Sequence, residues 1–236
     1  MASVPFYRFL SPIIRSKSLH LLYQYRLLSF TAVNHSANKQ KNIIYTRTGD
    51  NGSSGLFSGE RRPKDDTIFE ALGTTDELTS AIGLAREFIN NTTIRDELEQ
   101  IQCILQDLQA TIATPKTSAS EFQLRRTKWN INHLVDLETW IDSHSESLPP
   151  LKNFILPSGG KAASCLQLSR AICRRAERRL VPLLDEGLEL PVLQYLNRLS
   201  SYLFTVARVC TKIDGFQETI YRRPRPMDDE ENDEQD

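Results

Sequence analysis

Apolar residues recur at intervals of three and four positions through most of the chain beyond residue 65. That spacing gathers them on one face of an α-helix, in which successive residues turn by about 100°. No segment longer than a few residues shows the strict alternation typical of a half-buried strand. The pattern predicts long helices at 65–89, 94–113, 131–144 and 160–184, and a fifth that begins near Pro191. We therefore expect an all-α protein in which five helices form a bundle.

Capping and turn residues support these boundaries. Asp65 and Asp66 stand where they can accept hydrogen bonds from the first amides of the first helix. Pro191 suits the first turn of the last helix. Residues 43–64 contain four glycines and a proline, which predicts a loop. Residues 114–129 are polar and basic and are expected to be a connection.

The fourth predicted helix carries a dense cluster of arginines, because residues 169–179 read SRAICRRAERR. Helical spacing places Arg170, Arg174 and Glu177 together, with Arg178 beside them. The opposite side is predicted to be an apolar stripe of Cys165, Leu168, Ile172, Ala176 and Leu183. Guanidinium groups offer a planar fork of donors that suits phosphate oxygens. From the spacing alone, two interpretations stay open: a polyphosphate site, or a solvated face of i,i+4 ion pairs.

Charge is unevenly distributed although the net charge of the 236 residues is only −1. The first 49 residues contain several arginines and lysines and no acidic residue, which is typical of a mitochondrial transit peptide. We assign that peptide to residues 1–32; a basic disordered arm is the alternative. Residues 224–236 are dominated by acidic side chains and are expected to form a disordered tail. No apolar run reaches the length of a membrane span.

The four cysteines do not form a close CxxC pair. This spacing disfavours a zinc site or a disulfide framework and fits a reducing compartment.

Four separated blocks of sequence accompany the arginine cluster. They read YTRTGDNGSSGLFSGERRPK at 45–64, GTTDEL at 73–78, FILPSGG at 154–160 and YLNRLS at 195–200. In this order, with RRAERR between the third and fourth, they resemble the PduO-type ATP:cob(I)alamin adenosyltransferases, and most closely the mitochondrial type. The resemblance covers roughly residues 43–223, the expected catalytic domain.

The resemblance implies the identity of the ATP-binding residues. Those carried over by position are Thr46, Arg47, Thr48, Gly49, Ser54, Gly55, Lys64, Arg174, Arg175, Ala176, Glu177, Arg178 and Asn197. A Gly/Ser loop taken alone is usually only a loop, although its amides and hydroxyls can form an anion-binding nest. The chain departs from the family pattern at Asn51, where lysine is common, and at Ser201, where aspartate is common.

The cobalamin side of the site is also implied by the resemblance. Phe154 is expected against the lower face of the corrin, and Asp76 is expected to pair with Arg170 across a subunit boundary. Without the family context, Phe154 would be assigned to the core and Asp76 to a helix surface. Arg174, Glu177 and Phe154 are the residues expected to support catalysis, with Mg²⁺ on the triphosphate.

The implied protein is a homotrimer of five-helix subunits in the mitochondrial matrix, with ATP and cobalamin as substrates. A mutase and a reductase are possible partners, and neither nucleic acid nor a membrane is expected. A non-enzymatic carrier of adenosylcobalamin is the first alternative. The second alternative is a helical RNA-binding protein. Two observations disfavour it: Glu177 interrupts the basic face, and no aromatic platform accompanies the arginines.

Overall fold

The computed structural model describes residues 45–224. The transit peptide predicted at 1–32 lies outside these residues, as does the acidic tail from residue 225 onward. The chain divides into two units, residues 1–47 and 48–236. All helices and strands reported below belong to the second unit.

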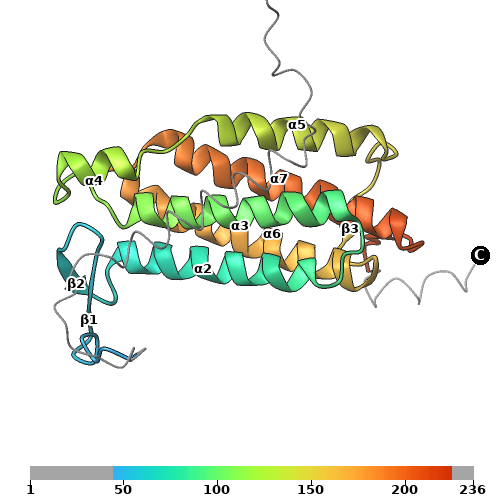
Figure 1. Cartoon of the computed structure of the whole chain (residues 1–236). Coiled ribbons are helices and arrows are strands. Elements are labelled where there is room, and N and C mark those ends of the chain that lie inside the picture. Colours follow the sequence, from blue (N-terminus) through green and yellow to red (C-terminus); the bar gives the residue numbers. More distant parts are fainter. Residues whose placement is uncertain (1–44, 225–236) are drawn as a thin grey trace, which may run out of the picture. The chain divides into compact units, whose positions relative to one another are not determined.

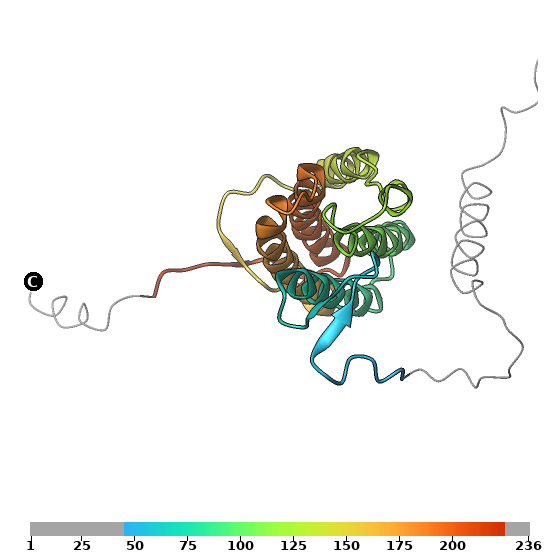
Figure 2. The same cartoon turned by 90° about the vertical axis from the view of Figure 1, so that its left-hand side faces the viewer.

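Helices dominate the second unit, which confirms the predicted all-α class. Five long helices lie side by side (Figures 1 and 2). They are α2 (Thr67–Arg86), α3 (Thr92–Ile112), α5 (Asn132–Glu146), α6 (Gly160–Leu180) and α7 (Leu190–Ile213). Each corresponds to one predicted helix, with ends displaced by a few residues. The connection predicted at 114–129 also contains a short helix, α4 (Glu121–Arg126), that the apolar pattern did not reveal.

Residues at the helix ends explain where two of these helices begin. The Asp66 carboxylate accepts a hydrogen bond from the Ile68 amide and caps α2, as predicted. Pro191 occupies the first turn of α7, where its missing N–H costs no hydrogen bond. A 3₁₀ turn, η2 (Val181–Leu184), connects α6 with the segment that leads to α7.

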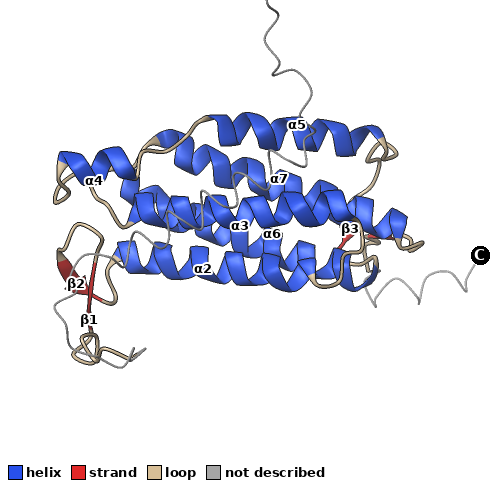
Figure 3. Ribbon diagram, in the orientation of Figure 1, coloured by secondary structure: helices blue, strands red, loops and turns tan. Residues whose placement is uncertain are grey.

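Two small antiparallel sheets lie next to the helices, and the sequence did not predict either (Figure 3). β1 (Ser53–Gly55) pairs with β2 (Arg61–Pro63) within the region predicted as a loop. β3 (Ile155–Leu156) pairs with β4 (Thr219–Ile220). Strands of two or three residues are too short to show a detectable alternation of apolar and polar positions.

The apolar stripe predicted on α6 was right only in part, because Ala176 and Leu183 are buried and the other three residues are not. Leu168 is 55% exposed, and Cys165 and Ile172 are only half-buried. The buried side is instead formed mainly by small residues, namely Ala162, Ala163, Leu166, Ser169, Cys173, Ala176 and Leu180. Because α6 packs against both α2 and α7, small side chains let the three helices approach closely. The large apolar residue at 168 therefore points away from the core.

A buried polar network joins three helices within this core. The Glu97 carboxylate on α3 accepts a hydrogen bond from the Tyr202 hydroxyl of α7, with an O···O distance of 2.7 Å. The same carboxylate oxygen lies 2.7 Å from His144 Nε2 of α5. Tyr195, also on α7, is fully buried, but its hydroxyl has no hydrogen-bond partner among residues 45–224. We therefore expect the Tyr202 hydroxyl to stabilise the fold more than the Tyr195 hydroxyl does.

We expect Tyr202→Phe to lower the free energy of unfolding by about 1.5–3 kcal/mol, because it removes a hydrogen bond to a buried carboxylate. Tyr195→Phe is the matched control on the same helix and should change stability little, since its hydroxyl has no hydrogen bond to lose among residues 45–224. Urea unfolding followed by circular dichroism measures both. Equal stability of the two variants would contradict the network's contribution.

Candidate functional site

The glycine-rich segment forms a hairpin with an irregular loop at its open end. The Arg61 guanidinium donates hydrogen bonds to the Thr48 carbonyl at 2.6 Å and to the Ser53 side-chain oxygen at 2.9 Å. The Lys64 amide donates to the Gly52 carbonyl at 2.9 Å. These bonds fold residues 48–53 back against β2. The predicted nucleotide loop therefore has a defined shape within the described chain.

Gly49 and Lys64 lie in contact within this loop. A Cβ atom added at Gly49 would stand 3.2 Å from Lys64 Nζ, so a larger residue would displace the ammonium group. The Lys64 side chain is exposed and makes no ion pair with any residue between 45 and 224. Its charge is available to an anionic ligand. Ser54 and Gly55 form part of β1 and lie in the same hairpin.

Thr46 and Arg47 belong to the preceding unit. The Arg47 guanidinium lies over the Tyr45 ring, 5.4 Å from its centre. Arg47 also has a φ of 58°, in the left-handed region that residues other than glycine seldom adopt.

The turn of the hairpin is anchored on α3 and α4. Leu56 is buried, and the Phe57 amide donates a hydrogen bond to the Ala113 carbonyl at 3.0 Å. The Phe57 carbonyl accepts a hydrogen bond from Gln123 Nε2 at 2.8 Å. The helix missed by the sequence analysis thus has a structural role, because it holds one end of the candidate nucleotide hairpin.

The arginines of α6 are divided between the two flanks of that helix. Arg175 forms an ion pair with Glu77 of α2. Arg179 lies 3.5 Å from the Glu70 carboxylate, also on α2. These two arginines therefore fit the ion-pair interpretation of the cluster.

The opposite flank of α6 faces α7. Glu177 accepts a hydrogen bond from Asn197 Nδ2 at 2.8 Å. The Arg178 guanidinium donates to the Arg174 carbonyl within α6, at 2.9 Å. Arg174 is exposed, and its guanidinium has no hydrogen bond or ion pair with any described residue. Arg174 is therefore an uncompensated cation next to the Glu177–Asn197 pair, while Ala176 is buried on the core side of α6.

Arg170 lies one turn before Arg174 and stacks on an aromatic ring. Its guanidinium carbon lies 5.4 Å from the centre of the Phe204 ring of α7. Burial lowers the pKa of Arg170, and the nearby charge of Arg174 lowers it further. Two like charges at this spacing favour an anion between or beside them. Asp76 is exposed on α2 and makes no ion pair with Arg170 within the described part of one chain.

The antiparallel packing of α2 and α6 brings the hairpin to the carboxyl end of α6. The Glu70–Arg179 and Glu77–Arg175 pairs run in opposite chain directions along the two helices. Lys64 lies directly before the start of α2, so it and Arg174 belong to the same end of the helices. Figure 1 shows β1 and β2 at this end and β3 at the other.

Phe154 directly precedes β3 and belongs to that other end. Fourteen residues separate Gly160, where α6 begins, from Arg174, a rise of roughly 21 Å along the helix. The Phe154 side chain is 73% exposed, which excludes a core position within the described chain. Its ring makes an edge contact with Tyr221, with centres 6.0 Å apart. A single chain therefore does not bring Phe154 near the arginines.

The glycines after Phe154 allow close packing within the chain rather than approach to a ligand. A Cβ at Gly159 would stand 2.0 Å from Thr211 Oγ1, and one at Gly160 would stand 2.6 Å from Phe216 Cε2. Both glycines have φ values near 90°, which other residues seldom adopt. An open hollow of ≈ 710 Å³ lies beside this turn, between residues 148–155 and 208–220.

No group of three or more His, Cys, Asp or Glu side chains in residues 45–224 could hold a metal ion. Among the same residues, no helix is sufficiently long and apolar to cross a membrane.

Together, these features define a helical protein that presents exposed cations from a glycine-rich hairpin and from one long helix. The chain belongs to the cobalamin adenosyltransferase family, whose sequence profile matches residues 44–210. It is 55% identical over 183 residues to the corrinoid adenosyltransferase MMAB of Mus musculus, covering 76% of this chain and 77% of that protein. The human protein of the same name is 52% identical over 191 residues, covering 80% of this chain and 76% of its own length.

The fold is also similar to solved structures. A variant of the PduO-type ATP:corrinoid adenosyltransferase from Lactobacillus reuteri, complexed with cobalamin and ATP, superposes with a TM-score of 0.70 at 35% identity. The match covers 77% of this chain and all of that one. These comparisons confirm the family that the four sequence blocks indicated.

Proposed function

We propose that this protein transfers the 5′-deoxyadenosyl group of ATP to the cobalt of reduced cobalamin. The observation that carries the proposal is the exposed Arg174, whose guanidinium is unpaired within residues 45–224, beside the Glu177–Asn197 pair and at the same end as Lys64. Membership in the cobalamin adenosyltransferase family supports it. The relatives named above are corrinoid adenosyltransferases, and the solved relative holds both cobalamin and ATP.

In this reaction the cobalt(I) electron pair forms a bond to the 5′ carbon of ATP. The bond from that carbon to the triphosphate oxygen breaks, and triphosphate leaves with the bonding electrons. Because the nucleophile is the cobalt centre itself, the chain's own residues position the reactants and stabilise the charge of the leaving group. Arg174, Arg178 and Lys64 are suited to the triphosphate oxygens, and Asn197, oriented by Glu177, is suited to a nucleoside hydroxyl.

Mg²⁺ is proposed on the triphosphate, where it would neutralise part of the charge. Since the described residues contain no cluster of metal-binding side chains, nucleotide oxygens and water would supply most of its ligands. Glu177 could contribute its second carboxylate oxygen, because only Oε1 is bonded to Asn197.

A homotrimer with a site between subunits is also part of the proposal. Phe154 and Arg174 lie at opposite ends of α6, so a neighbouring subunit would have to supply one of them. Exposed apolar side chains on α2, on the turn that follows it and on α6 offer a surface for that neighbour, and they include Leu84, Phe88 and Leu168. Asp76 and Arg170 are then available to pair across the boundary.

The reaction is tested with purified protein, ATP and chemically reduced cobalamin. We expect the spectrum of the cobalt–carbon product to appear together with one triphosphate per product. A carrier of adenosylcobalamin would bind that compound without releasing triphosphate from ATP, so this measurement separates the two functions.

We also propose the mitochondrial matrix as the location, because residues 1–49 are basic and contain no acidic residue. Protein isolated from mitochondria should begin near residue 30, as measured by mass spectrometry of its N-terminal peptide. Recovery of the matrix form with Met1 intact would contradict the transit peptide.

A further inference from the structure

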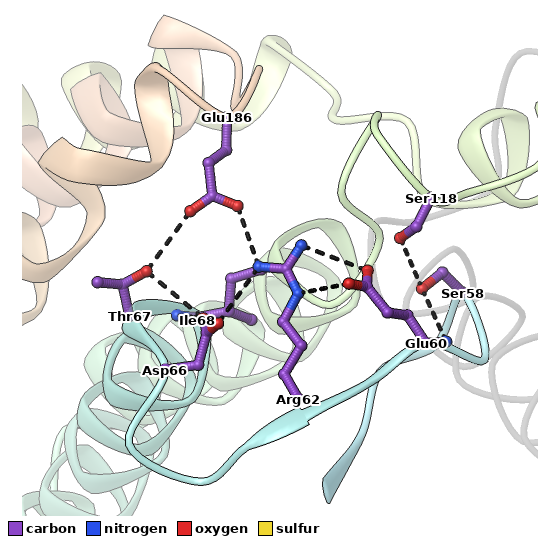
Figure 4. A network of polar contacts seen from close by, with 8 residues as sticks. All are labelled: Ser58, Glu60, Arg62, Asp66, Thr67, Ile68, Ser118 and Glu186. Atoms are coloured by element: carbon purple, nitrogen blue, oxygen red, sulfur yellow. Dashed lines mark hydrogen bonds and ion pairs between the residues drawn. The ribbon is translucent and has the colours of Figure 1, made fainter.

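Arg62 on β2 contacts three carboxylates that come from different parts of the chain (Figure 4). Its guanidinium donates two hydrogen bonds to Glu60, at 2.9 and 3.3 Å. Its Nη1 atom lies 3.2 Å from Glu186 and 3.5 Å from Asp66. The Arg62 side chain is only 16% exposed, so these contacts lie in a partly desolvated position. We call Arg62 and these three carboxylates the Arg62 network.

Each member of the Arg62 network holds a different element. Asp66 caps the first turn of α2, and Glu60 belongs to the hairpin. Glu186 follows η2, the turn that continues from α6. Glu186 also accepts a hydrogen bond from the Thr67 hydroxyl at 3.5 Å. The network therefore joins the candidate nucleotide hairpin to the carboxyl end of the helix that carries Arg174.

The charges of the network make it sensitive to the loss of Arg62. The three carboxylates surround one guanidinium, and hydrogen bonding to Glu60 raises the pKa of Arg62. Reciprocally, the hydrogen bond from Arg62 lowers the pKa of Glu60, and Ser118 lowers it further. Without the guanidinium, three like charges would face one another and repel. Removing Arg62 would thus push the hairpin away from η2 rather than only loosen it.

The predicted nucleotide residues lie next to this network and not within it. Lys64 follows Arg62 by two residues, directly after β2 ends, and its side chain lies against Gly49. Lys64 is exposed, whereas Arg62 is saturated with carboxylates. Within the described residues, the Arg62 guanidinium faces carboxylates, and β2 connects it directly to Lys64, which contacts Gly49.

We propose that Arg62 is a positioning residue for ATP, which holds the hairpin against the end of α6 before the nucleotide arrives. This inference rests on the proposed function, since it assumes that ATP binds at the hairpin. If the protein already holds the hairpin in place, ATP binding does not have to supply the free energy of ordering it. Loss of Arg62 should therefore weaken ATP binding and leave the chemical step intact once ATP is bound.

The test compares steady-state kinetics of Arg62→Gln with those of the unaltered protein. If only about a tenth of the variant molecules hold the hairpin in the position that binds ATP, KM for ATP rises about tenfold. We expect kcat and KM for cobalamin to stay within about twofold, a split that general destabilisation would not produce. Arg125→Gln is the matched control, because Arg125 pairs with Glu121 on the exposed surface of α4. It should leave all three parameters unchanged.

A double variant tests the charge argument. Arg62→Gln combined with Glu186→Gln removes one of the repelling carboxylates, so its KM for ATP should be lower than that of Arg62→Gln alone. Hydrogen exchange gives a readout independent of activity. The Leu56 and Lys64 amides, bonded to the Glu60 and Gly52 carbonyls, should exchange faster in Arg62→Gln without ATP. Saturating ATP should restore their protection.

Two results would overturn the proposal: an unchanged KM for ATP in Arg62→Gln, or unaltered exchange of the hairpin amides. A kcat that falls as far as kcat/KM would also overturn it, because Arg62 would then act in the transition state. Failure of the unaltered protein to bind ATP would instead count against the proposed function, so the two failures are distinguishable.

Discussion

Replacement of Arg174 by alanine is expected to reduce turnover by about two to three orders of magnitude. Removing one preorganised donor from a developing negative charge costs about 2.7–4 kcal/mol in the transition state. Each 1.4 kcal/mol or so is roughly tenfold in rate. The loss should appear in kcat and in KM for ATP, because triphosphate is bound in the ground state and gains charge as it leaves. Steady-state assays at limiting and saturating ATP measure both.

The fold should survive this substitution, because the Arg174 side chain is exposed and its guanidinium has no partner among residues 45–224. Arg179→Ala is the matched control on the same helix. Arg179 makes one long ion pair with Glu70 on the surface, which is worth little. We expect Arg179→Ala to retain turnover within about threefold. Wild-type kinetics in Arg174→Ala would refute its assignment to the triphosphate.

Phe154→Ala is expected to slow adenosylation by an amount that depends on the oxidation state of the cobalt at the start of the assay. If the ring lies against the lower face of the corrin, it displaces the axial ligand and makes cobalt(II) easier to reduce. Adenosylation that starts from cobalt(II) with a reductant of limited strength should fall by about a hundredfold, the effect of roughly 2.7 kcal/mol on the barrier. Adenosylation of chemically prepared cobalt(I) should fall much less, because its axial ligand is already weakly held.

Stability distinguishes this role from simple packing. A buried phenylalanine truncated to alanine costs about 3–5 kcal/mol, but Phe154 is 73% exposed within the described chain. The melting temperature of Phe154→Ala should therefore change little. Phe122→Ala, which truncates an exposed ring on α4, is the control and should affect neither assay. Equal losses from both cobalt states, accompanied by a lower melting temperature, would leave the cobalamin side of the site unassigned.

The helices could be predicted from the sequence because a periodic pattern over 15 or more residues is a strong signal. The orientation of α6 could not, since the sequence does not reveal that α6 is packed on two flanks. That packing requires small residues such as Ala163 and Ser169, and it leaves Leu168 outside. The strands β1 and β2 could not be predicted, because three residues are too few to show an alternation of apolar and polar positions.

The candidate site was predicted in part. The sequence blocks named Arg174, Glu177 and Asn197, and the structure brings Glu177 and Asn197 into contact. Their roles in ATP binding stay predictions. Neighbouring arginines look identical in the sequence, so only the structure shows that Arg175 is paired with Glu77, whereas the Arg174 guanidinium is unpaired within residues 45–224.

The Arg62–Glu186 contact joins residues 124 positions apart. Such a pair has no local signal, although an arginine directly before a proline in a glycine-rich segment could have drawn attention to the hairpin.

The separation of Phe154 from Arg174 along α6 has a genetic consequence if the active site forms between subunits. A subunit altered at Phe154 still has an intact Arg174, and a subunit altered at Arg174 still has an intact Phe154. In a cell with one allele altered at Phe154 and another at Arg174, mixed oligomers would contain some sites with neither defect. Two alleles that each abolish function alone could then restore it together, so variants of this protein would have to be judged in pairs rather than singly.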